Sequence, residues 1–540
     1  MRNRALKTWP AAAVWILLLA GPPQSPAEES LHRVWAVKDC KIITQSGPAI
    51  EKGTVVIRDG LIEAVGPGAA VPADAETIDG SALTVYPGLI DILNQSLLKL
   101  PELKFDQTKI LTGQYTDEDK GITPGLLAFD IIDLSKAAVE KLHKYGFAAV
   151  QALPMRGLLT GQAAVFSVSG TDKNQSLLLK DNALGIGFSP ANFMVYPNSL
   201  MGVVSFLRQE FSDVSYFIMR RDRWRKDMRG LARPAYVARH DLLADYAAAG
   251  KPAVFFCRNQ HDIRRALELA PELKLDFFIL DQGSESWRVL PELKKAGARV
   301  FCPVDFKVPA SSLHSQFGKE KKEAAEKELY PKNPARLAEA GIPFAFCSVG
   351  TDDPKSFMEG VVKAVENGLP SAQALEAMTI TASRFLGLDR ALGTVEKGKI
   401  ANLVLVEGDL LAVEPKVHYL FADGTKFDVL KAKAEAAAKP TVNVSGKWEF
   451  DIQGAGLKVT MDLVQEDTGL SGRMSTPFGA FDFTGGTVSG NQIDFETTLQ
   501  VGGQSIDLYF SALVEGDRMT GSVVQGTEGS AEFTAKRIPG

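Results

Sequence analysis

Acidic and sulfur-bearing side chains recur near the ends of apolar runs in the middle of the chain. Asp281 and Asp352 are acids that could form a general acid/base pair or bind a hard metal ion, since carboxylates serve both chemistries. We predict these two as the catalytic residues. Cys257, Cys302 and Cys347 could instead form a thiolate site for zinc.

Both sets also have a simpler interpretation. Acids in loops are commonly solvated, and strand cores often contain Cys as a small hydrophobic residue. The chain has only four Cys and six His, and no two His are spaced as HxH or HxxxH. One disulfide is possible, but four distant Cys do not make a disulfide scaffold. The chain contains no nucleophile elbow, phosphate-binding loop or zincin helix motif.

These residues are positioned by a long region of alternating strand and helix patterns. Seven apolar runs bounded by turns predict buried strands: one ending near Leu93, then 146–153, 183–189, 251–257, 276–280, 298–304 and 343–348. Helix-periodic segments separate them. This alternation predicts a parallel sheet, either a closed (β/α)₈ barrel or a doubly wound sheet. We expect the eighth strand within 190–250.

Segments rich in β-strand signals flank this region. Residues 34–66 and 393–411 alternate apolar and polar positions as short half-buried strands do. A helix-prone, low-complexity linker follows, and 446–536 contains about eight short strands with Gly-rich turns. We predict a lipocalin-like antiparallel barrel there, whose interior either holds an apolar ligand or is filled with side chains.

Composition and the first residues bound the function. Hydrophobic content of 45%, 23% charged residues and a net charge of −5 indicate a globular protein without a basic footprint for nucleic acid. A basic start followed by an apolar run over about 11–20 predicts a cleaved secretory signal, with an uncleaved anchor as the alternative. We therefore expect a periplasmic or secreted protein with no other membrane segment. The basic run 219–230 is a solvated surface or a contact for an anionic ligand or membrane.

Several motifs together resemble the amidohydrolase superfamily, in particular its imidazolonepropionase-like secreted branch. They are "IEKGTVVIRDGLIEAVG", "VYPGLID", "GLLTGQAAVFSVSG", "NPARLAEAGIPFAF" and "EAMTITASRFLGLDRALGTVEKGKIANLVLVEGDLL". The resemblance covers about 34–411 and implies a (β/α)₈ barrel, of α/β class, beside a composite β-sandwich. The expected division is a signal peptide at 1–27, a sandwich from 28–84 and 388–430, the barrel at 85–387, a linker at 431–445 and the C-terminal β-barrel at 446–540.

The resemblance also implies where metal ligands would stand, because the family binds one or two divalent metals such as zinc at the carboxyl ends of the strands. The positions that correspond to family ligands are Leu93, Gln95, Phe256, Cys257, Gln282 and Ser348. Leu and Phe have no lone pair, and Gln is a weak ligand beside imidazole. We therefore predict no bound metal and no other cofactor.

Two functions remain open at this point. By resemblance, the chain is a hydrolase acting on non-peptide carbon–nitrogen bonds of small cyclic amide-like substrates, with a degenerate metal site. The alternative is an inactive pseudoenzyme that serves as a ligand-binding or assembly module. A small molecule is the expected partner in either case, and a homo-oligomer is possible. An enzyme should bring polar groups into an open pocket, whereas in a pseudoenzyme Leu93 and Phe256 would fill the former metal cavity.

Overall fold

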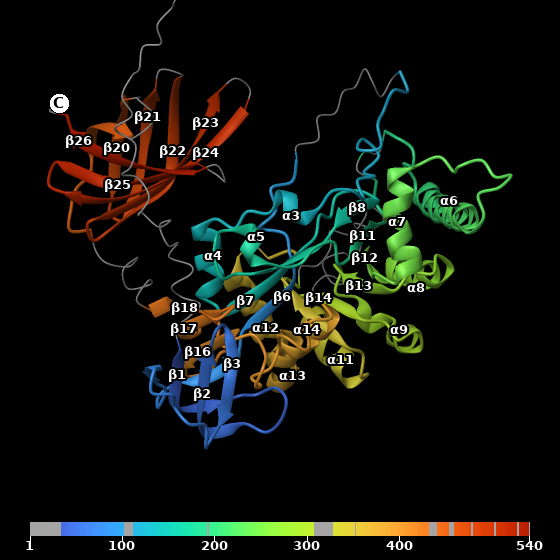
Figure 1. Ribbon diagram of the computed structural model, residues 1–540, viewed down its shortest axis with the longest axis horizontal. Coiled ribbons are helices and arrows are strands. Elements are labelled where there is room, and N and C mark those ends of the chain that lie inside the picture. Colours follow the sequence, from blue (N-terminus) through green and yellow to red (C-terminus); the bar gives the residue numbers. More distant parts are fainter. Residues whose placement is uncertain are drawn as a thin grey trace, which may run out of the picture. The chain divides into compact units, whose positions relative to one another are not determined.

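The computed structural model describes most of the chain, as two compact units that divide between Phe427 and Asp428 (Figure 1). The described residues are 34–101, 112–190, 192, 194–306, 328–351, 353–430, 440–452, 458–476, 479–501, 504–525 and 529–538. The predicted catalytic residue Asp352 and the predicted signal segment lie outside them.

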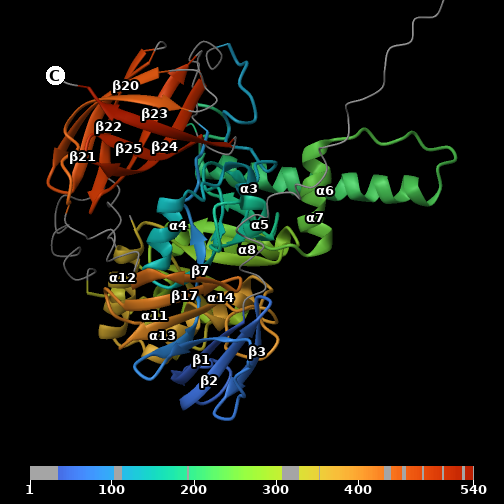
Figure 2. The same cartoon turned by 60° about the vertical axis from the view of Figure 1, so that its left-hand side comes forward.

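The first unit contains an eight-stranded sheet built from both ends of its sequence. The N-terminal strands are β1 (Trp35–Ile42), β2 (Ile50–Arg58), β3 (Leu61–Gly66), β4 (Glu76–Asp79) and β5 (Thr84–Pro87). The C-terminal strands are β16 (Leu403–Glu407), β17 (Lys416–Ala422) and β18 (Thr425–Asp428). The two groups join where β5 pairs antiparallel with β16, and Figure 2 shows them side by side.

The rest of this unit is a TIM-barrel-like α/β domain. Its parallel strands are β6 (Leu89–Asn94) with β7 (Phe147–Ala152), and then the run β11 (Leu184–Gly187), β12 (Ala253–Cys257), β13 (Phe277–Asp281), β14 (Val300–Pro303) and β15 (Phe344–Cys347). Every residue of β6, β7, β12 and β15 is buried, as expected for strands covered on both faces.

The expected eighth strand is not in 190–250; the described residues there form mainly two helices. The vacant place between β7 and β11 is taken by the adjoining strands β8 (Leu159–Gln162) and β9 (Ala164–Ser167). β8 pairs antiparallel with β11, and β9 pairs antiparallel with β7. β9 also pairs with β10 (Leu177–Leu179). The barrel therefore contains an antiparallel element that the alternating pattern did not predict.

Helices connect and cover these strands. They are α3 (Ala128–Ile131), α4 (Lys136–His143), α5 (Lys173–Ser176), α6 (Leu200–Lys226), α7 (Ala238–Ala249), α8 (Gln260–Glu272), α9 (Leu290–Ala296), α11 (Asn333–Glu339), α12 (Pro354–Glu366), α13 (Ser371–Ala377) and α14 (Ile380–Phe385), with 3₁₀ turns η1 (Ser286–Arg288) and η2 (Tyr330–Lys332). Helix α8 illustrates why these segments are helical. Asn259 caps its first turn, and its apolar face, with Ile263, Ala266 and Leu269, is buried. No described helix is long and apolar enough to cross a membrane.

The second unit is a closed all-β barrel of eight antiparallel strands. They are β19 (Gly446–Ile452), β20 (Lys458–Glu466), β21 (Gly469–Thr476), β22 (Gly479–Ser489), β23 (Gln492–Val501), β24 (Gln504–Glu515), β25 (Arg518–Gln525) and β26 (Gly529–Arg537). The last strand, β26, pairs with the first, β19, and this pairing closes the barrel. The expected antiparallel barrel is thus present, while its likeness to a lipocalin stays a prediction.

Aromatic and Met side chains pack inside this second barrel. Each of the eight strands supplies at least one buried large residue: Trp448, Met461, Met474, Phe483, Phe495, Phe510, Met519 and Phe533. The rings of Phe483 and Phe495 stack with centroids 4.4 Å apart, and those of Phe495 and Phe510 with centroids 4.8 Å apart. Of the two interpretations of its interior, this packing favours a barrel filled by its own side chains.

Candidate functional site

The first two positions expected to bear metal ligands lie at the end of β6. Leu93 has 0% of its surface exposed and belongs to an apolar cluster of the barrel. Its neighbours in that cluster include Ile90, Ile92 and Val349. Gln95 is half-buried, just beyond the strand. At the first of these positions, an aliphatic side chain therefore lies inside the ring of barrel strands.

Phe256, at the end of β12, lies in the same cluster with only 6% of its surface exposed. Its ring needs Gly185 on the neighbouring strand, since a Cβ there would stand 2.7 Å from Phe256 Cζ. The adjacent Cys257 is fully buried, and its thiol donates to the carbonyl oxygen of Phe255 over 3.6 Å. This arrangement does not suit a metal, because apolar side chains stand at positions where the resemblance leads us to expect ligands.

Ser348, which stands at an expected metal-ligand position, instead serves a buried carboxylate. The Ser348 hydroxyl donates to Asp91 Oδ2 over 2.5 Å, and its backbone N–H donates to Oδ1 over 3.1 Å. Asn94 Nδ2 and the Leu93 N–H complete four donors to Asp91. Burial raises the pKa of Asp91, and these hydrogen bonds oppose the rise. The network ties β6 to the residue after β15.

Asp281, predicted as catalytic, forms a second saturated network. It is fully buried and accepts hydrogen bonds from the N–H groups of Glu285 and Ser286, from the Ser286 hydroxyl and from Asn333 Nδ2. Burial raises its pKa above the ordinary value for an aspartate. In this arrangement Asp281 fixes the turn after β13. Gln282, next to it, is half-buried and donates its backbone N–H to Cys257 O.

The cysteines do not gather into a thiolate site in the described structure. All four are free and buried. Burial raises the pKa of Cys257, Cys302 and Cys347 well above that of an ordinary thiol, so they stay protonated at neutral pH. Among the described residues, no three His, Cys, Asp or Glu side chains are grouped so as to hold a metal ion. The donors present therefore do not fit the family's metal.

Space is distributed unevenly at the carboxyl ends of the strands. Beside Asp91 and Ser348 the structure leaves only about 10 Å³, which is the size of a single water site. A cavity of about 530 Å³ lies instead off the ring centre. Its lining comes from the segment after β6, the turn after β7 and the start of α7. This cavity is thus displaced from the positions where the resemblance leads us to expect metal ligands.

Close backbone contact builds the wall of this cavity, which we call the side cavity. The segment after β6 lies against β8, where Ile122 bridges to Leu159 and Leu127 bridges to Gln162. Gly157 permits this approach, because it has φ +102° and a Cβ there would stand 2.4 Å from Gly121 Cα. The apolar part of the lining includes Leu100, Pro101, Ile122, Pro124, Leu126, Pro154 and Leu242.

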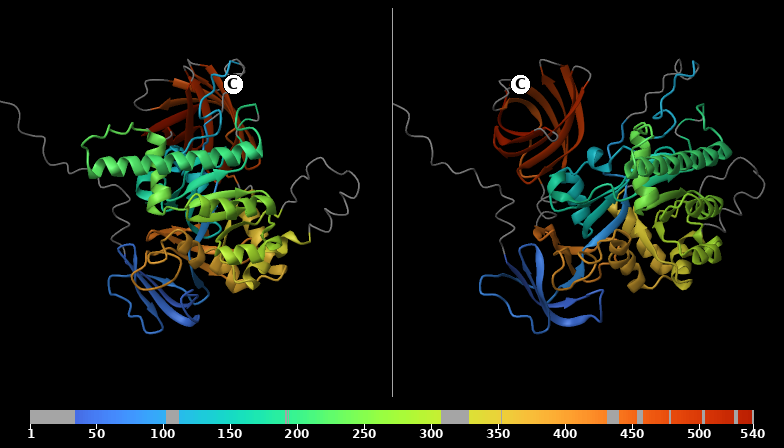
Figure 3. Two further views of the ribbon diagram at one scale, coloured as in Figure 1. Left: turned by 90° about the vertical axis from the view of Figure 1, so that its right-hand side faces the viewer. Right: turned by 45° about the vertical axis from the view of Figure 1, so that its right-hand side comes forward.

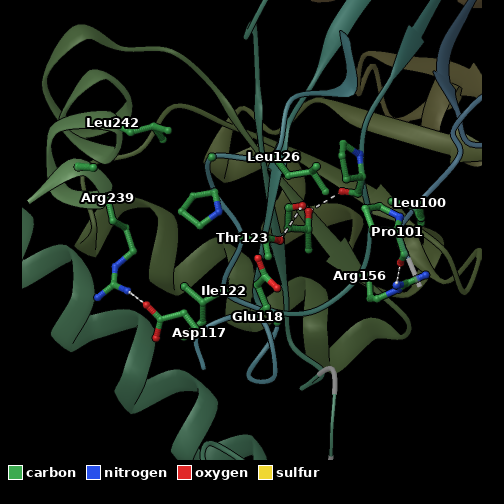
Figure 4. A pocket seen from close by; sticks show the side chains of 16 residues that line it. Leu100, Pro101, Asp117, Glu118, Ile122, Thr123, Leu126, Arg156, Arg239 and Leu242 are labelled. Carbon is green, nitrogen blue, oxygen red and sulfur yellow. Dashed lines mark hydrogen bonds and ion pairs between the residues drawn. The ribbon is translucent and has the colours of Figure 1, made fainter. Parts of the chain in front are cut away.

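Charged groups stand around this apolar wall (Figure 4). Arg239 forms ion pairs with Asp117 and, over 2.6 Å, with Glu210. Arg156 Nη1 donates to the carbonyl oxygen of Pro101 over 2.6 Å, and its other nitrogens have no hydrogen-bond partner among the described residues. The carboxylate of Glu118 has no hydrogen-bond or ion-pair partner among the described residues, and in Figure 4 it lies between Asp117 and Arg156.

No charged residue of the side cavity is among those predicted from the sequence. Arg156 closely follows the strand predicted at 146–153, and this position is the one sequence signal that points to it. Glu118 and Arg239 come from segments without a strand pattern, so only the tertiary structure brings them together. The sequence-predicted residues Leu93, Phe256 and Ser348 do lie near the ring centre, but the structure gives them packing and hydrogen-bonding roles.

Comparisons with known proteins confirm the resemblance to the amidohydrolase superfamily. The amidohydrolase family model matches residues 330–444. A 5-methylthioadenosine/S-adenosylhomocysteine deaminase from Moorella thermoacetica is 37% identical over 67 residues, which is 12% of this chain and 16% of that protein. The crystal structure of an amidohydrolase from Thermotoga maritima superposes with a TM-score of 0.61 and 20% identity, covering 73% of this chain and 99% of that one. The latter likeness shows the fold; the narrower imidazolonepropionase-like branch stays a prediction.

Proposed function

We propose that this chain, which the amidohydrolase family model matches over 330–444, binds a small organic molecule in the side cavity and does not use the superfamily's metal chemistry. The observation that carries the proposal is the placement of Leu93 and Phe256. Both lie inside the apolar cluster where family ligands would hold a metal. A binding function is consistent with a fold that hosts many activities.

The lining of the side cavity suggests the class of ligand. Apolar walls suit the carbon skeleton of a small ring. Glu118 offers hydrogen-bond acceptors without a described partner, and Arg156 offers donors. An amide group has one donor and one acceptor, so it complements a carboxylate on one side and a guanidinium on the other. Small cyclic amide-like compounds are therefore the first class to screen.

The first test is elemental analysis of the full chain purified without chelators. We expect zinc, iron and manganese well below one equivalent, because no described residues form a ligand set. One equivalent of a metal that resists dialysis would contradict the proposal. Native mass spectrometry of the same sample then looks for a co-purified small molecule.

The site is tested by filling the cavity. Leu126→Trp adds a bulky side chain to the cavity wall, and Leu411→Trp makes the same change at a half-buried Leu outside it. We expect Leu126→Trp to abolish binding of the co-purified or screened compound and Leu411→Trp to leave it unchanged. Equal binding by both variants would place the ligand elsewhere.

Hydrolysis of a carbon–nitrogen bond at the same cavity is the second candidate. Glu118 favours it, because a carboxylate without a described partner can act as a general base toward water or substrate. The test is turnover of cyclic amides by the chelator-treated protein. We expect any real turnover to be lost in Glu118→Gln and retained in Glu366→Gln, which neutralises an exposed Glu on α12. No turnover with intact binding would leave binding as the function.

A further inference from the structure

We propose that the end of α6 and the loop after it form a docking surface for an anionic membrane. We call residues 216–236 the basic tip. They contain seven Lys or Arg and only two Asp, in a chain whose net charge is −5. This surface is independent of the side cavity and of any chemistry there.

The basic tip extends beyond the part of α6 that packs on the barrel. The buried residues of α6 end at Phe217, although the helix continues to Lys226. Ion pairs tie α6 to its neighbours: Arg208 pairs with Glu272 of α8 at 2.8 Å. Glu210 and Arg221 pair with Arg239 and Asp241 of α7, at 2.6 and 3.0 Å. Figures 2 and 3 show the remaining turns of α6 and the following loop projecting past α7.

Most cations of the basic tip are exposed and available. Arg229 and Arg221 have acidic partners, but the tip's other cations form no ion pair with described residues: Arg220, Arg223, Arg225, Lys226 and Arg233. Cations in the last turn of a helix also favour the helix dipole, which is a purely structural role. That role does not account for the cations of the loop, so the cluster has charge beyond what the helix end uses.

Exposed apolar side chains accompany these charges. Eight of the twelve large hydrophobic residues that are exposed in the described structure lie within 194–236. In the basic tip Met219, Met228 and Tyr236 are 57%, 58% and 74% exposed, and Arg233 lies 5.8 Å from the ring centroid of Trp224. A surface with only a solvating role has no need of exposed Met and Tyr.

This mixture of side chains fits a membrane surface. Arg and Lys attract anionic headgroups, while Tyr, Trp and Met enter the boundary between headgroups and acyl chains. The basic tip projects, so it can reach a flat surface without rearrangement of the barrel. A second copy of the chain would satisfy the charges as well, and the experiment separates these two occupants.

The experiment is sedimentation of the full chain with phosphatidylcholine vesicles that contain phosphatidylglycerol, against vesicles of phosphatidylcholine alone. We expect binding that requires the anionic lipid and weakens as salt is raised, since surface electrostatics is screened. Arg225→Glu/Lys226→Glu should weaken binding roughly tenfold or more. Lys294→Glu/Lys295→Glu is the matched control, because it reverses two exposed cations in the last turn of α9.

The apolar component is tested separately. Met219→Ser/Met228→Ser should also weaken binding, whereas Leu513→Ser, at a residue of the second unit with 52% exposure, should not. Every variant keeps the same N-terminus, so the first residues cannot explain a difference. No binding by the unaltered chain, or equal loss in tip and control variants, would overturn the proposal. A dimer that depends on the tip, without vesicle binding, would assign the surface to a second copy and overturn it too.

Discussion

The centre of the barrel and the side cavity both lie at the carboxyl ends of the strands, yet apolar side chains pack at the centre and an open space remains at the side. At the centre, Leu93 and Phe256 are buried in a cluster of apolar side chains. At the side, about 530 Å³ stays open between apolar walls and charged residues. The difference shows that the side cavity need not coincide with the position at which barrels of this fold usually carry out catalysis.

A physical reason connects the two regions. A metal centre needs several lone pairs that converge and a space for the ion, and without the ion such a space would be a polar void that is costly to keep. Filling it with Leu and Phe restores close packing. The buried carboxylate of Asp91 is then satisfied by hydrogen-bond donors of the protein, chiefly Ser348 and Asn94.

The largest expected effect comes from removing the centre's packing. Leu93→Ala should lower the free energy of unfolding by about 2–5 kcal/mol, because it leaves a cavity among fully buried neighbours. Denaturant unfolding measures the loss. Ligand binding at the side cavity should persist under conditions where the variant stays folded. A loss of unfolding free energy below about 1 kcal/mol would mean that the centre is loosely packed and does not differ from the side cavity in this respect.

The pH range in which the two regions can be compared is set by a buried histidine outside both. Burial lowers the pKa of His143 to about 4, and its Nε2 lies 2.6 Å from Val168 O. The ring donates there, which partly opposes the fall in pKa, but burial outweighs this bond and the folded state disfavours protonation. The contribution of His143 to the free energy of unfolding is therefore fully present above the unfolded-state pKa near 6.5. It is lost as the pH drops toward about 4, by about 3 kcal/mol in total.

The measurement is the free energy of unfolding against pH for the unaltered chain and His143→Gln. Glutamine can keep a donor toward Val168 O but does not titrate. The variant should lose most of the dependence between pH 6.5 and 4, whatever its stability at pH 7. An unchanged slope would assign the acid sensitivity to other groups, and binding assays below about pH 6 would then need a different control.

The hydrogen-bonded carboxylate beside the centre should give a smaller effect. Ser348→Ala removes the hydroxyl donor to Asp91 and should cost about 1–3 kcal/mol at neutral pH. The folded-state pKa of Asp91 is already raised by burial, and loss of a donor raises it further. Such a group stabilises the fold below its unfolded pKa and loses that contribution as pH rises. The cost of Ser348→Ala, measured by denaturant unfolding, should therefore be larger at pH 7 than near pH 4.

The sequence predicted the parallel strands well, because strands buried on both faces are short continuous apolar runs such as 251–257 and 343–348. It did not predict β8 and β9. A strand with Gly161 and Gln162 at its end has no clear alternation, and antiparallel pairing across two neighbours is a tertiary property. The motif also predicts that Leu93 stands where the family has a metal ligand, and this assignment stays a prediction.

The side cavity could not be predicted in the same way. Glu118 and Arg156 lie on segments whose approach depends on backbone contacts such as that of Gly157 with Gly121. A loop residue carries no periodic signal, so its neighbours follow only from the folded chain. Asp281 shows the converse case, since a strand-end acid predicted to be catalytic is fully buried and accepts hydrogen bonds from Ser286 and Asn333.

The smallest effect on stability is expected from a substitution in the wall of the side cavity. Leu126 is half-buried on the wall of the side cavity, so Leu126→Ala enlarges an existing opening rather than creating a closed void. It should cost less than about 1 kcal/mol in unfolding free energy. The same change should weaken ligand binding by roughly tenfold, because it removes an apolar contact of the ligand. Leu93→Ala is its counterpart, with a large effect on unfolding and a small one on binding. If both variants changed unfolding and binding alike, the centre and the side cavity would act as one packed region, and the ligand would have to bind elsewhere.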